Sequence, residues 1–340
     1  IKASATCVLN FDGAKGFLIG EPNKGLNCMF TMMNHARLGT GMQGLCLGEA
    51  SFQGAIQYAN DRLQMRSLTG PKAPEKVADP IIVHPDVRRM LLTMKAFNEG
   101  NRALTYFTAQ WLDTAHLSPD AGARQEAEDV LAFLTPICKA FMTDTGLEVT
   151  NHGMQVFGGH GFIREWGMEQ LVRDCRIAPI YEGTNGIQAL DLLGRKVLGS
   201  QGKLLRGFTR IVHEFCAANA GHPQLASYVT QLNELNQQWG ELTVKVGMAA
   251  MKNPDEVGAA SVDYLMYSGY IVLGYLWLRM AVVAQSQIDA GSGDADYCRG
   301  KLATNEFYFK RLLPRTAAHR AAIEAGSECL MQLPAELFAL

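Results

Sequence analysis

The sequence has little net charge and no block of positive charge. Its 340 residues include 31 Lys and Arg against 33 Asp and Glu, which leaves a formal net charge of −2. No run of Lys and Arg interleaves with aromatic side chains, so a nucleic-acid backbone would find no basic surface to bind. We therefore expect no nucleic-acid partner.

Paired cysteines are also lacking. The eight cysteines are scattered, with no C-x-x-C motif and no Cys/His cluster at metal-ligand spacing. This pattern predicts reduced thiols and no metal site. It favours a reducing intracellular compartment such as the cytoplasm.

The chain shows neither a signal peptide nor a transit peptide at Ile1, and we expect it to begin inside a longer protein. Its longest apolar run, Tyr264 to Val283, has the length of a membrane span but contains Ser268, two glycines and Arg279. These residues favour a buried helix, so membrane contact is not expected. A peripheral membrane role for this run stays open as an alternative.

Strand-like sequence is confined to residues 1–24, where 5–11 and 16–20 flank an Asp12-Gly13 turn. An isolated hairpin is marginal in water, so we interpret this stretch as the edge of a larger β domain lying upstream. From Gly25 onward, helical periodicity with Gly and Pro breaks takes over. Helices are expected over residues 26–65, 84–117, 122–157, 185–198, 203–218, 223–251, 258–288 and 298–331.

Two breaks divide the helical part. Residues 67–80 are polar and carry three prolines, which predicts a surface loop. Residues 198–202 contain two glycines and separate a first helical unit from a second. The sequence thus predicts a mainly α fold: 1–24 as the end of a β domain, 25–200 as a helical bundle and 201–340 as an additional helical domain. With 48% hydrophobic residues, the chain can bury a core for both helical units.

One glycine motif imitates a dinucleotide site. Residues 39–44 satisfy G-x-G-x-x-G, and Asp61 follows at about the expected distance of 20 residues. No strand precedes the motif and its flanks are continuously helical, so we reject a Rossmann site. We expect these glycines to permit close helix packing.

Glu182 lies in a loop directly before a predicted helix. Asn185 and Gln188 form a capping box at the start of that helix. An acid here can simply be favoured by the helix dipole. However, apolar and aromatic residues precede it, and Gly183 allows a ligand to approach the backbone. Periodicity alone leaves both interpretations open.

Residues 180–184, Ile-Tyr-Glu-Gly-Thr, and 155–162, Gln-Val-Phe-Gly-Gly-His-Gly-Phe, together resemble the paired signature of acyl-CoA dehydrogenases. Arg37 and the segments 58–62 and 139–141 fit the same family order. The resemblance covers residues 1 to about 200. It implies that the four-helix-bundle, flavin-binding C-terminal domain of the family occupies 25–200.

The resemblance also implies an activity: FAD-dependent α,β-dehydrogenation of an acyl-CoA thioester to trans-2-enoyl-CoA, as in fatty-acid β-oxidation. Glu182 occupies the position of the base that removes the α-proton while a hydride passes to flavin N5. The developing enolate needs preorganised donors, which in the family are the glutamate N–H and a flavin ribityl hydroxyl. Some relatives place the base beside the arginine of an earlier helix, but residues 34–38 contain no acid, which favours Glu182.

The resemblance further implies binding roles. Arg37, Asn34 and Gly183 would contact substrate, with Asn34 standing where relatives carry a CoA-contacting aspartate. Arg62 matches the arginine that reaches the FAD pyrophosphate of the neighbouring subunit, a task suited to a guanidinium. The remaining cofactor-binding positions implied by the family pattern are Gln64, His84, Gln155, Gly158, Gly159 and Thr184.

The insertion at 67–83 and the extension beyond residue 200 resemble the larger bacterial branch of the family, which includes 3-methylmercaptopropionyl-CoA dehydrogenase and longer-chain enzymes. This branch implies a homodimer or a dimer of dimers with FAD at the subunit interface. It also implies an electron-transfer flavoprotein as electron acceptor. The length of the acyl chain stays open.

Two further alternatives remain. An acyl-CoA oxidase would share the base and differ in oxygen access. A non-catalytic, dimerising helical module is the other, because the family's N-terminal helical domain and most of its β domain have no counterpart in these 340 residues. On its own, we expect the chain to be helical, to hold little FAD and to be inactive.

Overall fold

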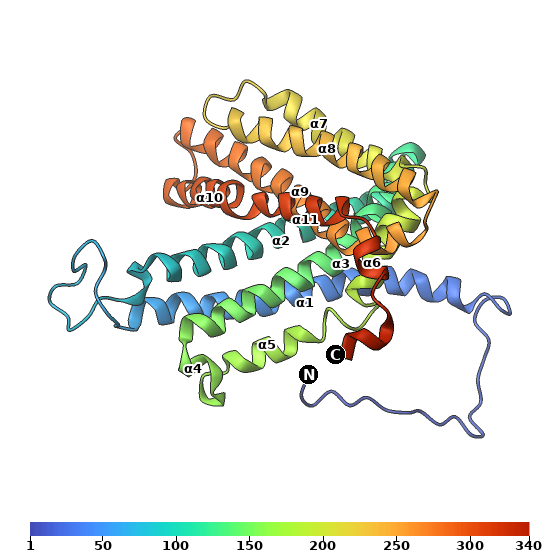
Figure 1. Cartoon of the computed structure of the whole chain (residues 1–340), viewed down its shortest axis with the longest axis horizontal. Coiled ribbons are helices and arrows are strands. Elements are labelled where there is room, and N and C mark those ends of the chain that lie inside the picture. Colours follow the sequence, from blue (N-terminus) through green and yellow to red (C-terminus); the bar gives the residue numbers. More distant parts are fainter. Residues whose placement is uncertain (340) are drawn as a thin grey trace.

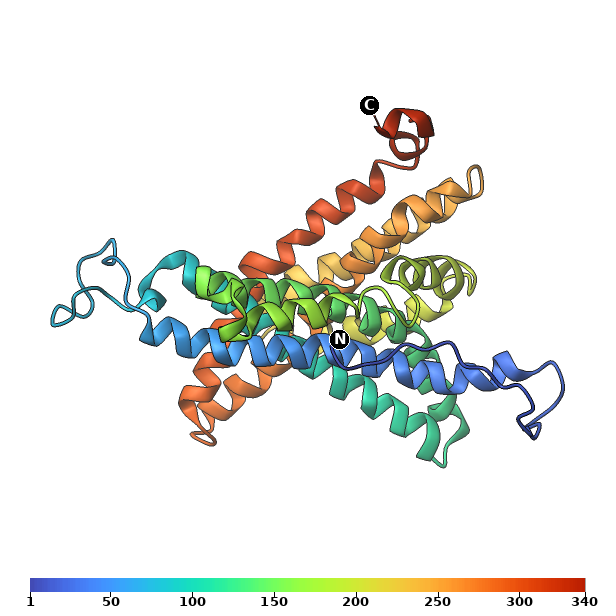
Figure 2. The same cartoon turned by 90° about the horizontal axis from the view of Figure 1, so that it is seen from below.

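The computed structural model describes residues 1–339, except for the side chains of Asn27, Thr31 and Asn34. Three long helices run side by side through its first half: α1 (Gly25–Asp61), α2 (Pro85–Leu117) and α3 (Ala121–Phe157) (Figures 1 and 2). The shorter α5 (Met168–Arg176) packs along α1 and α3 and completes a bundle. The predicted mainly α fold is confirmed.

A second group of helices covers α2 and α3. Its central member, α9 (Asp255–Asp289), packs on α8, α10 and α11 and also reaches α2 and α3. Apolar side chains from both groups therefore form one continuous core. The other elements of this half are α6 (Asn185–Leu190), a π-helical turn Asp191–Leu198, α7 (Lys203–Asn219), α8 (Ala226–Ala250), α10 (Ala295–Phe307), a second π-helical stretch Tyr308–Leu312, α11 (Thr316–Glu324) and α12 (Glu328–Met331). Shorter pieces are α4 (Gly159–Phe162) and the 3-10 turns Ile81–Val83, Arg164–Trp166, Leu313–Arg315 and Ala335–Ala339.

Residues 1–24, interpreted from the sequence as the edge of a larger β domain, form no strand pair within this chain. The chain turns at Asp12-Gly13, but the flanking segments do not pair, and Val8, Phe17 and Ile19 are more than 90% exposed. Two short segments without further strands bury too little surface to hold together. These residues run as an extended arm beneath the bundle (Figure 1).

Two expected helices end or divide differently. α1 ends at Asp61 rather than residue 65, because Arg62 turns to extended backbone and Leu63 pairs with Pro80. The helix expected over 298–331 is divided into α10, α11 and α12 with π-helical and 3-10 turns between them. Pro314 lies at the division, where its ring and missing N–H prevent a continuous α-helix.

The predicted surface loop is built around one buried carboxylate. Asp79 is fully buried, and its oxygens accept hydrogen bonds from the backbone N–H groups of Ser67, Lys72 and Ala73 at 2.8–2.9 Å. The Arg66 guanidinium lies 3.2 Å from the same carboxylate. The backbone N–H and C=O of Asp79 pair with Met65 and Gln64, which fixes both ends of the loop.

Two glycines of the G-x-G-x-x-G motif, Gly41 and Gly44, bring α1 and α3 into backbone contact, whereas a Cβ on Gly39 would meet nothing within 4 Å. A Cβ on Gly44 would lie 2.4 Å from the carbonyl oxygen of Met142, and one on Gly146 would lie 2.6 Å from the Cα of Gly44. Gly41 meets the Cys138 carbonyl oxygen equally closely, at 2.6 Å. Only glycine permits this approach. The prediction that the motif serves helix packing is confirmed.

Two helices, α3 and α9, are long and apolar enough to cross a bilayer. Most of the apolar stretch of each is buried inside the protein, 72% for α3 and 61% for α9. Length and composition are weak evidence here, since the core helix of a soluble protein meets the same criteria.

Candidate functional site

Glu182 lies in the turn between α5 and α6, in a strained backbone conformation. Its φ is +56° and that of Gly183 is +80°, so two consecutive residues occupy the left-handed region. For a residue with a Cβ this costs on the order of 1 kcal/mol or more, and such strain is concentrated at functional sites. Contacts with the rest of the fold must therefore hold the Glu182 turn in this strained conformation.

Asn185 attaches this turn to α3. Its Nδ2 donates hydrogen bonds to Asp144 Oδ1 at 2.8 Å and to the Ala140 carbonyl at 3.2 Å. Its Oδ1 accepts one from Lys139 Nζ at 2.8 Å, and the Thr143 hydroxyl lies 3.0 Å from its Nδ2. The first residue of α6 thus has a full set of partners on one face of α3.

The other side of the turn is attached to α1. The Tyr181 hydroxyl donates a hydrogen bond to Gln43 Oε1. Gly183 also fits a confined place, because a Cβ there would lie 2.5 Å from Gln188 Nε2. Glu182 is consequently held between two anchored residues: Tyr181 is hydrogen-bonded to α1, and Asn185 is hydrogen-bonded to α3.

Four charged groups share this region. Burial lowers the pKa of Lys139 from 10.5 to about 8, although Asp144 and Glu182 act in the opposite direction; Arg37 lowers it further. Burial also raises the pKa of Asp144, an effect partly offset by its hydrogen bond from Asn185. Glu182 therefore lies in a field that contains two cations, and Lys139 is fully buried.

Arg37 has unused binding capacity. Its Nε is buried and finds no hydrogen-bond partner among the residues that the structure describes. It lines a cavity of about 360 Å³ between α1, α2, α3 and the π-helical turn, together with Thr108, Asp191 and Lys196. A buried guanidinium N–H without a partner is costly, so this group is suited to a ligand or an ordered water.

A second pocket lies at the opposite end of α1. It has a volume of about 370 Å³ and is lined by Arg62, Gln64, Gly158 and Gly159, four of the predicted cofactor-binding residues, and by His160. Gly158 ends α3 with φ +60° and ψ −136°, a conformation that disfavours residues with a Cβ. A Cβ on either glycine would meet nothing within 4 Å, so their backbone is open to a ligand.

Three predicted cofactor residues lie outside the lining of this second pocket. His84 supports it indirectly, because its Nε2 lies 2.9 Å from the backbone oxygen of Gln64. Gln155 accepts a hydrogen bond from the Gly158 N–H through its carbonyl at 3.0 Å. Thr184 belongs to the Glu182 turn instead, where its carbonyl accepts from the Gln188 N–H. The side chain of Asn34 is not among the described parts of the structure.

Sequence reasoning missed an aromatic cluster beside the second pocket. The Tyr58 hydroxyl lies 2.9 Å from His160 Nδ1, and the His160 ring stacks on Trp166 with centroids 4.8 Å apart. Tyr58 also stacks on Phe157 at 4.1 Å. Tyr58 and His160 stand within the motifs already noted, so their presence was visible in the sequence, but their contact across about 100 residues was not.

Metal chemistry has no evident centre in residues 1–339. No group of three or more His, Cys, Asp or Glu side chains is arranged to hold a metal ion there. All eight cysteines are free thiols, four of them exposed and four buried.

The two candidate sites are far apart on one chain. Arg37 lies in the N-terminal half of α1 and Arg62 directly follows its C-terminus, and the 24 residue steps from Arg37 to Asp61 rise by about 36 Å at 1.5 Å per residue. One small ligand therefore does not contact both arginines of the same chain.

Two family profiles match the sequence. The one described as "Acyl-CoA dehydrogenase, C-terminal domain" matches residues 23–198, and "Acetyl-CoA dehydrogenase C-terminal like" matches residues 208–334. The 3-methylmercaptopropionyl-CoA dehydrogenase of Ruegeria pomeroyi is 39% identical over 97% of this chain and 56% of its own length. The broad-specificity linear acyl-CoA dehydrogenase FadE5 of Mycobacterium tuberculosis is 33% identical over 99% of this chain and 57% of its own length. The chain thus spans somewhat more than half the length of these curated relatives.

Solved structures share the fold. ACDH-11 of Caenorhabditis elegans, in complex with C11-CoA, superposes with a TM-score of 0.71 at 18% identity, over 90% of this chain and 49% of the other. An acyl-CoA dehydrogenase of Bacillus anthracis, complexed with FAD, gives a TM-score of 0.67 at 21% identity, over 90% and 51% of the two chains. Both likenesses cover nine-tenths of the chain and so extend beyond the bundle of residues 25–200.

Proposed function

Because this chain belongs to the acyl-CoA dehydrogenase family, we propose that it is the helical, catalytic part of an enzyme that converts an acyl-CoA thioester to a trans-2-enoyl-CoA. The observation that carries the proposal is the Glu182 turn. A carboxylate in a left-handed conformation is held from both sides by Tyr181 and Asn185, beside the cations of Lys139 and Arg37. This arrangement suits a catalytic base, because it holds the carboxylate group in one position.

Glu182 accepts the α-proton of the thioester in this proposal. Removal of that proton places negative charge on the thioester oxygen, and preorganised donors lower the cost of that charge. The N–H of Glu182 is the donor proposed from this chain. Arg37, with its unpaired buried Nε, is proposed to bind the substrate, and Lys139 places a positive charge near the Glu182 carboxylate.

The cofactor proposed for this reaction is FAD, which supplies the acceptor for the hydride that leaves the β-carbon. The pocket of Arg62 fits such a group in the chemistry of its donors. A guanidinium pairs with a pyrophosphate through charge-assisted hydrogen bonds, and Gly158 and Gly159 leave their backbone uncovered. Gln64 adds an amide side chain with both donor and acceptor capacity.

The separation of the two sites supports an oligomer. About 27 Å of helix lie between Gln43, which holds the Glu182 turn through Tyr181, and Asp61, the neighbour of Arg62, which is farther than the pyrophosphate lies from the flavin ring within one FAD molecule. We therefore propose that the Arg62 pocket holds part of the flavin whose ring reacts at the Glu182 site of a neighbouring copy. A homodimer is the smallest assembly that satisfies this geometry.

An electron-transfer flavoprotein is the proposed acceptor of the electrons, and the bacterial cytoplasm the proposed location. An acyl-CoA oxidase is the alternative that shares every residue discussed so far. The two differ in where the electrons go, so hydrogen peroxide formed per enoyl-CoA in air separates them. Turnover that requires an added electron acceptor supports the dehydrogenase.

The decisive test is Glu182→Gln in a protein that joins this chain to the upstream part present in its relatives. We expect bound FAD to remain and its bleaching by acyl-CoA to slow by at least about 10²-fold, since only the base is lost. Glu234→Gln, an exposed acid on α8, is the matched control and should react normally. Undiminished flavin reduction in Glu182→Gln would remove the base assignment.

A further inference from the structure

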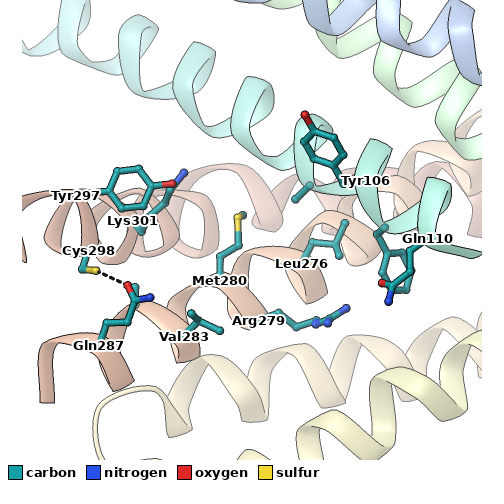
Figure 3. Close-up of a pocket in the computed structure, with 13 residues that line it drawn as sticks. Tyr106, Gln110, Leu276, Arg279, Met280, Val283, Gln287, Tyr297, Cys298 and Lys301 are labelled. Carbon is teal, nitrogen blue, oxygen red and sulfur yellow. Dashed lines mark hydrogen bonds between the residues drawn. The ribbon is translucent and has the colours of Figure 1, made fainter. Parts of the chain in front are cut away.

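A third cavity, of about 430 Å³, opens between α2, α9 and α10 (Figure 3). None of its lining residues belongs to the Glu182 turn or to the Arg62 pocket. Its size is that of a small-molecule site. It lies where the additional helices meet the bundle. The proposed function assigns no role to this cavity.

The walls of this cavity are largely apolar. The apolar side chains and aromatic rings that line it are Ala103, Tyr106, Phe107, Leu276, Met280, Val283, Ala284 and Tyr297. Met280 projects into the middle of the space from α9 (Figure 3). Such a surface favours an aliphatic chain, because each methylene group that enters it is removed from water.

Arg279 brings a positive charge to this apolar surface. Its guanidinium carbon lies 5.5 Å from the ring centroids of both Phe107 and Tyr275, so two aromatic rings hold it in place. None of the ion pairs found in residues 1–339 involves Arg279, and no carboxylate of this part of the chain lines the cavity.

Lys301 of α10 supplies the second cation. Its Nζ lies 2.7 Å from Glu99 Oε2, but the same carboxylate also pairs with Lys95. Two ammonium groups thus share one carboxylate. The cavity therefore has an excess of positive charge, of which only Arg279 is without a counter-charge.

From this arrangement we propose that the cavity binds a free medium-chain fatty acid. The carboxylate pairs with Arg279, and the aliphatic chain lies along Leu276, Met280 and Val283. A single uncompensated guanidinium matches a single negative charge better than a phosphate dianion, and its planar fork matches a carboxylate. The site is separate from the catalytic one, so it is a second place where this protein recognises an acyl chain.

The test is calorimetric titration of the 340-residue chain with decanoate. We expect saturable binding of one decanoate per chain, and weaker binding of decanol, which has the same tail without the charge. Arg279→Gln should weaken decanoate binding at least about tenfold, the effect of losing a charge-assisted hydrogen bond. Arg311→Gln, an exposed arginine on the Tyr308–Leu312 stretch, should bind as the unmodified chain does.

Two more variants secure the interpretation. Arg279→Lys keeps the charge and should retain part of the affinity, which separates charge from folding. Val283→Trp places a large ring at the exposed rim of the cavity and should reduce binding without disturbing the core. Glu182→Gln and Arg62→Ala should leave decanoate binding unchanged. Failure of the fatty-acid proposal is therefore distinguishable from failure of the proposed enzyme function.

Several results would overturn the proposal. These are the absence of saturable decanoate binding, equal binding of decanoate and decanol, or full affinity in both Arg279→Gln and Val283→Trp. Displacement of decanoate by short acyl-CoA with the same affinity as at the catalytic site would place it at Glu182 instead. Saturation of the cavity by an acidic helical peptide, with no binding of decanoate, would assign the surface to a protein partner.

Discussion

The ammonium of Lys139 donates a 2.8 Å hydrogen bond to Oδ1 of Asn185. A fully buried cation on α3 is thereby joined to the first residue of the helix that follows Glu182. The charge of Lys139 and the position of the Glu182 turn are consequently linked through one side chain.

The lowered pKa of Lys139 predicts a stability that rises with pH. In the unfolded chain this lysine has its ordinary pKa of 10.5, and in the folded chain about 8. Between these values the unfolded state binds more protons, so the free energy of unfolding increases as pH rises through the window. Below pH 8 the lysine is charged in both states and its contribution is constant.

Urea unfolding of the unmodified chain and of Lys139→Met across this pH window measures the effect. The unmodified chain should gain stability relative to the methionine variant as pH increases. Parallel curves for the two proteins would contradict the burial of a titrating lysine at this site.

Loss of the Arg62 guanidinium is expected to weaken FAD retention. Arg62→Ala should reduce FAD affinity by about 1.5–3 kcal/mol, the range for hydrogen bonds to charged groups, or roughly 10- to 150-fold. The measurement is flavin release from the oligomeric protein, with helical circular dichroism to show that the fold is retained. Arg311→Ala is the control. An Arg62→Ala protein that holds FAD as tightly as Arg311→Ala would show that the pocket serves another ligand.

An ion pair joins the bundle to the additional helices. The Arg315 guanidinium contacts both oxygens of Glu148 on α3, each at 2.8 Å. Burial alone would raise the pKa of Glu148, but the His152 imidazole, 3.5 Å from one of its oxygens, and the hydrogen bonds from Arg315 lower it from 4.5 to about 2. Because the folded pKa is the lower one, this stabilisation is complete above pH 4.5 and is lost as pH falls toward 2.

Glu148→Gln should therefore lower stability at neutral pH by about 1.5–3 kcal/mol and flatten the acid dependence of unfolding. Glu214→Gln is the matched control, since its pair with Arg210 is exposed and exposed pairs contribute about 1 kcal/mol or less. Equal thermal shifts in the two variants would mean that the Glu148 pair does not hold the two helical units together.

Two glycines in long helices give opposite expectations. A Cβ on Gly269 of α9 would lie 2.2 Å from the ring of Phe141, so Gly269→Ala should destabilise the protein by about 1–3 kcal/mol through overpacking. A Cβ on Gly240 of α8 would meet nothing within 4 Å, so Gly240→Ala should stabilise it by about 0.5–1 kcal/mol through helix propensity. Thermal unfolding compares them, and shifts of the same sign would contradict the close contact of α9 with α3.

The helices of the bundle could be predicted from the sequence because α1, α2 and α3 are long, periodic and bounded by Pro, Gly or Asp. The π-helical turns could not be predicted, since an extra residue in a turn leaves no mark in a period of 3.6. The strand-like alternation of residues 1–24 gives no strand within this chain, because a strand forms only when a neighbouring strand is present to pair with it. Local pattern carries no information on that neighbour.

The candidate sites divide in the same way. Glu182, Arg62 and Gly158 were found because their motifs keep a fixed order along the chain. Lys139 and Asn185 lie within or beside the family motifs, but a lysine in an apolar helix usually lies on the solvent-exposed face. Their partnership joins residues 46 positions apart, and only the packing of α6 on α3 reveals it.

The loop built around Asp79 has a fixed base beside the Arg62 pocket and an exposed tip. The Asp79 carboxylate accepts hydrogen bonds from the backbone N–H groups of Ser67, Lys72 and Ala73. The Asp79 backbone pairs with Met65 and Gln64 and so fixes the base of the loop. The exposed tip beyond it is free to change in sequence or accept an inserted label, while Arg62 and Gln64 keep their places. A fluorophore or affinity tag in this tip would therefore report from the edge of the Arg62 pocket without entering it.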